Sequence, residues 1–113
     1  MVKKLERNGL VAVLVSPDYG AGWSSWADEQ ERELMLFDPD IAQAVLAHEN
    51  NPVKTQMVRD IQQVVELKSY QSYTGGLEQL RVVWMPKGAQ FRVTEYDGSE
   101  GIELVSQIRW DIA

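Results

Sequence analysis

The sequence predicts an α+β fold in which an antiparallel sheet packs against a pair of helices. Three observations lead to it: an apolar run of six residues near the N-terminus, two segments of helical period that follow Asp-Pro and Asn-Pro pairs, and a two-residue period after residue 79. The 113 residues can bury a core without disulfide or metal cross-links, so we expect a single domain over residues 1–113.

The first element is the run Leu10–Val15, which comes after an Asn8-Gly9 turn and ends at Ser16-Pro17. Every position of the run is apolar and three are valine, which is typical of a strand covered on both faces. The run is too short for the hydrophobic region of a signal peptide or for a membrane span. We therefore expect a buried strand and a cytoplasmic protein without membrane contact.

A loop of aromatic residues and glycines, residues 19–26, follows this strand. After it, residues 28–37 place charged side chains ahead of Leu34, Met35 and Leu36. This pattern fits a short helix, and it fits equally a polar loop that leads into a second strand.

Two helices are expected between residues 38 and 67. Asp38-Pro39 indicates a helix start, because an aspartate N-cap satisfies free backbone N–H groups and a proline at the first helical position gives up no hydrogen bond. Asn51-Pro52 repeats this signal for a second helix, and the two should pack as a pair on one face of the sheet. Their apolar stripes comprise Ile41, Val45 and Leu46, and then Val53, Met57, Val58, Ile61, Val64, Val65 and Leu67.

The C-terminal part of the chain has the period of strands. Apolar and polar residues alternate over residues 80–85, 91–94 and 102–112, and glycine-containing turns separate these segments. We predict a C-terminal three-stranded antiparallel meander packed against the helix pair.

The composition excludes several kinds of site. The chain has no cysteine and a single histidine, His48, so it lacks disulfides, thiolate metal sites, a cysteine nucleophile and any site that needs two imidazoles. A formal net charge of -6, from 17 acidic and 11 basic residues, offers no basic surface for the phosphates of nucleic acid. We expect no cofactor, no metal and no direct nucleic-acid partner, and we place His48 at the stabilising C-terminal end of the first helix.

The glycine loop is the first candidate binding site. Its Gly-Ala-Gly segment after a strand resembles the opening of a dinucleotide-binding motif, although Ser25 stands where the third glycine is expected. Two interpretations are open: the tryptophans cap the core, or they form an aromatic platform for a base or a partner side chain. The candidate residues are Tyr19, Gly20, Gly22, Trp23, Ser24 and Trp26.

Arginines on the predicted C-terminal strands are the second candidate. A row of guanidinium groups on one sheet face, with a tyrosine nearby, can clamp an anionic ligand bidentately. Cross-strand pairing with Glu103 or Asp111 would neutralise the row instead. The candidate residues are Arg81, Arg92, Tyr96 and Arg109.

Acidic residues around the last turn, Glu95, Asp97 and Glu100, support an alternative function. Converging carboxylates can hold a divalent cation or do acid–base work, as in a metal-assisted hydrolase. Solvated hairpin charges explain the same residues. A further alternative is an acidic mimic of nucleic acid, in which surface carboxylates imitate phosphates.

Two stretches of the chain resemble small uncharacterised proteins encoded by bacteriophages and prophages. They read VAVLVSPDYGAGWSSW, residues 11–26, and VWMPKGAQFRVTEYDG, residues 83–98. The resemblance implies a setting in which such proteins inhibit or sequester components of host defence or host metabolism.

We therefore expect a non-enzymatic binding protein in the host cytoplasm. It would inhibit a host defence factor or sequester a small anionic, nucleotide-like ligand. The chain is short and makes a shallow pocket, which a symmetric homo-oligomer would deepen.

Overall fold

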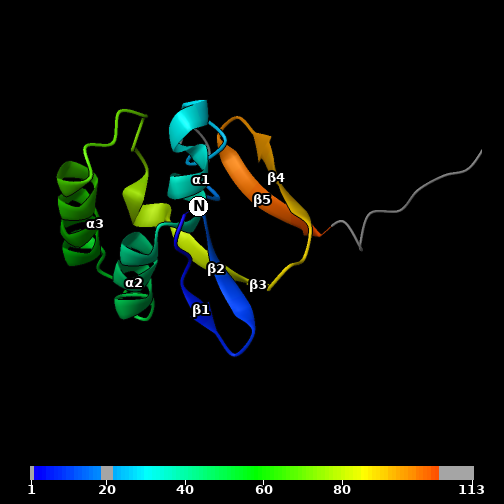
Figure 1. Ribbon diagram of the computed structural model, residues 1–113. Helices are drawn as coiled ribbons and strands as arrows, with labels where there is room; N and C mark the ends of the chain where they lie inside the picture. The colour runs from blue at the N-terminus through cyan, green and yellow to red at the C-terminus, as the bar shows by residue number, and fades with distance from the viewer. Residues whose placement is uncertain (1, 19–21, 105–113) are drawn as a thin grey trace, which may run out of the picture.

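Strand β2 (Leu10–Val15) lies at the centre of a three-stranded antiparallel sheet, between β1 (Glu6–Arg7) and β3 (Arg81–Pro86). The computed structural model describes residues 2–18 and 22–104 (Figure 1). The last five residues of β2 are buried, because helices cover one face of the sheet and a hairpin covers the other. The expected double-sided burial of this strand is confirmed.

The helix pair expected from the sequence covers one face of the sheet. It consists of α2 (Pro39–Ala47) and α3 (Thr55–Leu67), which lie side by side (Figure 1). The cluster between these helices and the sheet also takes in the short 3-10 helix η1 (Leu77–Gln79) that leads into β3. Its buried members are Ala12, Leu14, Trp23, Met35, Ile41, Ala42, Val45, Met57, Ile61, Leu77 and Leu80.

The opposite face of the sheet is covered by a hairpin of β4 (Phe91–Tyr96) and β5 (Ser99–Leu104). Phe91 meets the ring of Phe37 edge to face, with the ring centroids 6.2 Å apart. Ile102 packs against the same cluster, in which the valines of β2 and Phe37 are the buried members. The second apolar surface of β2 is thereby removed from water.

The α+β class, the antiparallel sheet and the helix pair are confirmed, whereas the strands pair differently from the predicted meander. β3 pairs with β2, from Val15 opposite Arg81 to Leu10 opposite Pro86, while β4 pairs only with β5 in a separate sheet among the described residues. A two-residue period predicts that a segment is a strand, but it does not predict which other strand it pairs with. Burial decides the partner, since the hairpin must cross the sheet to cover the valine face of β2.

Residues 28–37, left open between helix and loop, form helix α1 (Glu29–Phe37). Met35 and Phe37 at its C-terminal end are both buried, and they belong to the clusters on opposite faces of the sheet. The helix therefore closes the end of the sheet where the two clusters meet.

The start of α2 is set by a side-chain oxygen, whereas α3 starts without a side-chain cap. Asp38 caps α2, with Oδ1 accepting hydrogen bonds from the backbone N–H of Asp40 at 2.9 Å and of Ile41 at 3.3 Å. α3 begins later than expected, because Asn51 Oδ1 accepts from the N–H of Val53 and closes a turn there. Val53 is consequently 63% exposed, outside the predicted apolar stripe.

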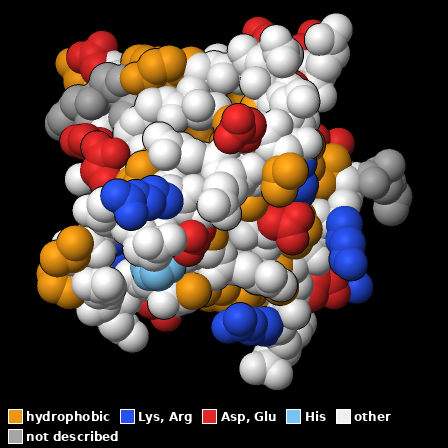
Figure 2. All heavy atoms as spheres, turned by 90° about the vertical axis from the view of Figure 1, so that its left-hand side faces the viewer, with side chains coloured by type: hydrophobic (Ala, Val, Ile, Leu, Met, Phe, Trp, Pro, Cys, Tyr) orange, Lys and Arg blue, Asp and Glu red, His pale blue; other side chains and the backbone are white. Residues whose placement is uncertain are grey.

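The apolar stripe of α3 also ends earlier than predicted, before Leu67. Leu67 is 85% exposed, because it lies at the last residue of the helix beyond the reach of the sheet. Figure 2, which faces the helix side of the molecule, shows apolar, basic and acidic side chains in small interspersed groups. No helix in the described part of the chain is long and apolar enough to cross a membrane.

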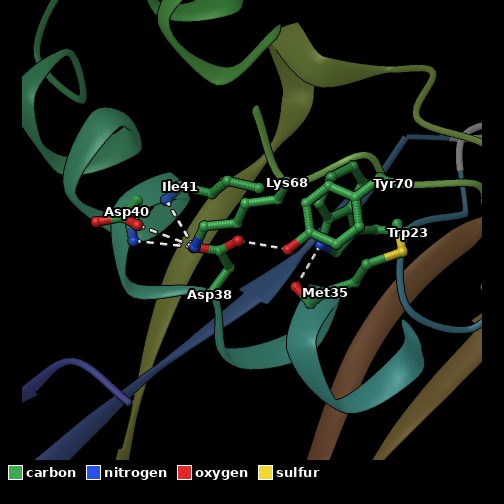
Figure 3. A network of polar contacts seen from close by, with 7 residues as sticks. All are labelled: Trp23, Met35, Asp38, Asp40, Ile41, Lys68 and Tyr70. Atoms are coloured by element: carbon green, nitrogen blue, oxygen red, sulfur yellow. Dashed lines mark hydrogen bonds and ion pairs between the residues drawn. The ribbon is translucent and has the colours of Figure 1, made fainter. Parts of the chain in front are cut away.

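A network around Asp38 joins the start of α2 to the segment after α3 (Figure 3). Asp38 is fully buried, and it accepts hydrogen bonds from Lys68 Nζ at 2.8 Å and from the hydroxyl of Tyr70. Lys68 also pairs with Asp40 at 2.9 Å. Burial raises the pKa of Tyr70, and the carboxylate of Asp38 raises it further. Burial lowers the pKa of Lys68, but the hydrogen bonds to Asp38 and Asp40 outweigh it and hold that pKa above its usual value.

Candidate functional site

The chain on either side of the glycine loop meets the hairpin β4–β5 at what we call the loop–hairpin junction, formed by residues 16–18, 22–26 and 95–100. The backbone N–H of Glu100 donates to the carbonyl of Ser16 at 2.8 Å. The hydroxyl of Ser99 donates to the carbonyl of Pro17 at 2.6 Å. These bonds bring together two parts of the chain that lie more than 80 residues apart.

The side chain of Glu100 fastens this junction. It is 4% exposed and accepts hydrogen bonds from the backbone N–H of Ser16 (3.0 Å), Trp23 (3.0 Å) and Ser25 (2.8 Å), and from the Ser25 hydroxyl (2.5 Å). We call these four donors the amide cradle. A buried carboxylate needs such donors to replace its lost hydration, and the cradle supplies them without a cation.

Trp23 is a core residue, which corrects its prediction as a stacking platform. Its ring is completely buried, and its indole N–H donates to the carbonyl of Met35 at 2.6 Å. Ser24 is completely buried as well, so its hydroxyl does not reach the surface where a ligand phosphate would lie. The large ring is more stable between the helices and the sheet than in water, which is the core-capping alternative.

Ser24 is one of two residues whose hydroxyls remain unpaired in the junction. Among the buried side chains that the structure describes, Ser16 Oγ and Ser24 Oγ have no hydrogen-bond partner. The backbone N–H of Ser16 donates to Glu100 as part of the amide cradle. The hydroxyls of Ser16 and Ser24 do not take part in the cradle.

Trp26, by contrast, lies at the surface in a fixed position. Its ring is 43% exposed, and its indole N–H donates to Glu95 Oε1 at 3.1 Å. A methyl group at Gly22 would overlap the ring, so the ring rests directly on this glycine. Tyr73 lies beside it, 53% exposed, with the ring centroids 5.9 Å apart and the planes tilted by 44°. A methyl group at Gly75 would overlap Tyr73 in the same way.

Trp26 and Tyr73, which we call the aromatic pair, are surrounded by carboxylates. Glu95 binds Trp26 directly, and Glu31 accepts from the backbone N–H of Ser72 (2.7 Å) and from its hydroxyl (2.5 Å), next to Tyr73 in the chain. The hydroxyl bond, opposed in part by burial, lowers the pKa of Glu31 and keeps it charged at neutral pH. The fold thus gathers acidic residues from α1 and from β4 around one exposed aromatic surface.

The predicted arginine row does not form among the described residues. Arg92 is paired with Glu103 across the hairpin at 2.7 Å, which is the neutralising alternative. Arg81 belongs to the other sheet, opposite Val15, and is exposed. Tyr96 is 71% exposed, four residues beyond Arg92 and so about 13 Å along the strand. Tyr19, Gly20 and Arg109 lie outside the described residues.

Glu95 and Glu100 lie opposite each other on the two strands of the hairpin, but different groups bind them. Glu100 is enclosed in the amide cradle, and Glu95 Oε1 accepts from Trp26 and from the backbone N–H of Gly98 at 2.6 Å. Asp97 is exposed in the turn at positive φ. Within residues 2–18 and 22–104, no group of three or more histidine or acidic side chains is placed to hold a metal ion.

His48 belongs to the helix pair and has a structural partner there. It ends α2, and its Nε2 lies 3.0 Å from Asp60 Oδ2 on α3. A hydrogen bond from Gln56 and the contact with His48 lower the pKa of Asp60. This pair fixes the spacing of the two helices.

A cavity of about 310 Å³ opens between α2, α3, η1 and β3, away from the loop–hairpin junction. Its apolar lining consists of Val45, Met57, Leu80 and Val82, and its polar lining of Glu49, Lys54, Glu78, Gln79 and Arg81. Acidic and basic residues are equal in number here, whereas the surroundings of the aromatic pair are acidic.

Sequence reasoning missed Tyr73 and the role of Glu100. The Gly75-Gly76 pair after Tyr73 was a signal that a ring could lie against the backbone. No local signal marked Glu100, because its donors are 75 to 84 residues away.

Comparison with known proteins finds no similar protein: no family model, no curated sequence and no solved structure matches the chain.

Proposed function

We propose that this chain is a non-enzymatic binding protein that inhibits another protein by docking the aromatic pair against it. The observation that carries the proposal is the fixed, half-exposed position of Trp26 and Tyr73. Tryptophan and tyrosine are the side chains that most often dominate the affinity of protein interfaces, because they bury large areas with few rotatable bonds.

The pair is already held in one arrangement before any partner arrives. Gly22 supports the ring of Trp26 from below, and Glu95 holds its indole N–H. Ordering a mobile side chain on binding costs about 0.5–1.5 kcal/mol, and a preformed pair avoids much of this cost. Such preorganisation is typical of side chains that dominate a binding surface.

The biological setting remains part of the proposal. We propose a host protein, such as a defence factor, as the target, which is the setting that the resemblance suggested by residues 11–26 and 83–98 would imply. Such a target would be met in the host cytoplasm.

The test is affinity capture from bacterial extract with the full chain as bait. Trp26→Ala and Tyr73→Ala should each lose the proteins that the unaltered chain retains, by about tenfold or more, the usual effect of removing a central aromatic contact. Leu67→Ala is the matched control, because Leu67 is also an exposed large apolar residue but lies at the end of α3. If the unaltered chain and all three variants retain the same proteins, the proposal is wrong.

A second candidate function is the capture of a small anionic, nucleotide-like ligand, and the 310 Å³ cavity favours it. Its volume is at the lower end of the range of about 300–1,000 Å³ for small-molecule sites. An apolar floor with Lys54 and Arg81 in the lining suits a flat ring that carries one phosphate.

Calorimetric titration with linear and cyclic mononucleotides tests this candidate. Binding that is lost in Arg81→Ala and kept in Arg92→Ala would support it, because Arg92 is already paired with Glu103. The absence of heat with every nucleotide would exclude it.

A further inference from the structure

We infer that the aromatic pair receives a cationic side chain of its partner, an arginine, which lies over the exposed rings and within reach of Glu95. This inference rests on the proposed function for the location of the surface and adds the chemistry of the partner. It differs from the alternative, drawn from the sequence, in which the tryptophans of this loop stack on an anionic, nucleotide-like ligand.

The ring of Trp26 is prepared for a cation. Its indole N–H is occupied by Glu95, so it cannot donate to an anionic ligand. A negative acceptor on the N–H also polarises the indole and strengthens the negative potential of the ring face. Tryptophan is the aromatic residue that attracts cations best.

The acidic side chains near the aromatic pair also favour a cationic partner. Residues 28–33 carry four acidic side chains and one arginine, and residues 93–104 carry four acidic and no basic side chains. The hairpin segment binds Trp26 through Glu95, and the other segment binds Ser72, next to Tyr73, through Glu31. An anionic ligand would be repelled here, and a cationic one would be attracted.

Two of these carboxylates, Glu31 and Glu95, have no ion-pair partner among the described residues. The ion pairs within the described part of the chain involve Asp38, Asp40, Asp60, Glu6 and Glu103, and therefore leave Glu31 and Glu95 un-neutralised there. Both hydrogen bonds to Glu95 fall on Oε1, whereas a carboxylate can accept about four. Glu95 retains the capacity to accept further hydrogen bonds from a guanidinium group.

The same contact occurs elsewhere in this chain. The guanidinium of Arg7 lies 5.5 Å from the ring centroid of Trp84, and the ammonium of Lys4 lies 4.3 Å from that of Phe37. Arginine fits the junction better than lysine, because its planar group can stack on a ring while its N–H groups donate bidentately to a carboxylate.

The experiment is a titration of the full chain, followed through the indole N–H signal of Trp26 in two-dimensional NMR. Trp26→Phe identifies this signal by its loss. The probes are three capped hexapeptides of alternating glycine with arginine, glutamine or aspartate. The arginine peptide should shift the signal, and the other two should not. An equal shift with glutamine, or a larger one with aspartate, would overturn the inference.

A matched pair of variants isolates the charge. Glu95→Gln keeps an oxygen that can accept from the indole N–H and removes the charge, and it should weaken binding of the arginine peptide by about tenfold. Glu103→Gln removes a charge from the same hairpin, but one already paired with Arg92, and it should leave binding unchanged. Equal effects of the two changes would also overturn the inference.

The outcomes separate the two proposals. If Trp26→Ala abolishes capture of a target while the arginine peptide leaves the indole signal unmoved, the proposed function stands and the cationic contact is wrong. If capture is the same for Trp26→Ala as for the unaltered chain, the proposed function fails whatever the peptide does.

Discussion

Two carboxylates are buried among the described residues, those of Asp38 and Glu100, and they are stabilised in different ways. Asp38 accepts from two backbone N–H groups but also from Lys68 and Tyr70, so side chains that can themselves titrate surround it. Glu100 accepts from three backbone N–H groups and one serine hydroxyl, with no cation among its partners in the described part of the chain. Each carboxylate fastens segments that are distant in the chain, Asp38 on the helix side and Glu100 at the surface of the aromatic pair.

This difference separates stability from binding. The backbone N–H groups that bind Glu100 are placed by the fold and have no side-chain proton to lose in alkali. The network around Asp38 depends on protons held by Lys68 and Tyr70 and should respond to alkali. Changes made in one region should therefore leave the other largely intact.

The largest expected effect is that of Glu100→Ala. It leaves three backbone donors without their acceptor, and we expect a loss of about 3–5 kcal/mol in the free energy of unfolding, measured in urea. Glu103→Ala, on the same strand and 45% exposed, should cost no more than about 1 kcal/mol. Equal losses of unfolding free energy in the two variants would show that the amide cradle does not stabilise the fold more than an exposed ion pair does.

Asp38→Ala should come next, with a loss of about 2–3 kcal/mol. The change removes the N-cap of α2 and leaves Lys68 with the more exposed Asp40 alone. Asp40→Ala is the control, because Asp40 is 59% exposed and its replacement keeps the cap. In Asp38→Ala the emission of Trp26 should not change, and a change would contradict the independence of the two regions.

Alkaline pH should weaken the network around Asp38 selectively. The pKa values of Tyr70 and Lys68 are raised in the folded chain from ordinary values of 10.0 and 10.5, so the unfolded chain loses these protons first as pH rises. Their contribution to stability is complete below about pH 10 and falls above it.

Melting curves between pH 8 and pH 11.5 check this dependence. Tyr70→Phe should flatten the decline above pH 10, because its side chain has no proton to lose. Tyr73→Phe, in the aromatic pair, is the control and should leave the decline unchanged. If Tyr73→Phe flattens the decline and Tyr70→Phe does not, the alkaline sensitivity does not arise from the network around Asp38.

The smallest effect on stability, and the most local one, is expected from Gly22→Ala. The new methyl group must displace the ring of Trp26, at a cost of about 1 kcal/mol in unfolding free energy. Quenching of Trp26 fluorescence by acrylamide should rise, because the displaced ring is more exposed to solvent. Gly75→Ala displaces Tyr73 instead, so it should weaken target capture without this rise in quenching.

The acidic and aromatic parts of the site could be anticipated from the sequence, but their geometry could not. Residues 19–26 were selected for their aromatic content, yet Trp23 is completely buried while Trp26 is 43% exposed. Nothing local distinguishes two tryptophans three residues apart in a glycine-bearing loop. Only the positions of Met35 and Glu95, which bind the two indoles, assign one ring to the core and the other to the surface.

By itself the sequence determined the features that depend on neighbouring residues. These are the α+β class, a β2 that is apolar on both faces, and the cap that starts α2 at Asp38. Tertiary structure alone decided that β3 pairs with β2, that Glu100 fills the amide cradle, and that acidic segments converge on the aromatic pair. The physical reason is distance along the chain: period and capping act within a few residues, whereas these contacts join groups about 40 to 85 residues apart and form only when the core selects one packing.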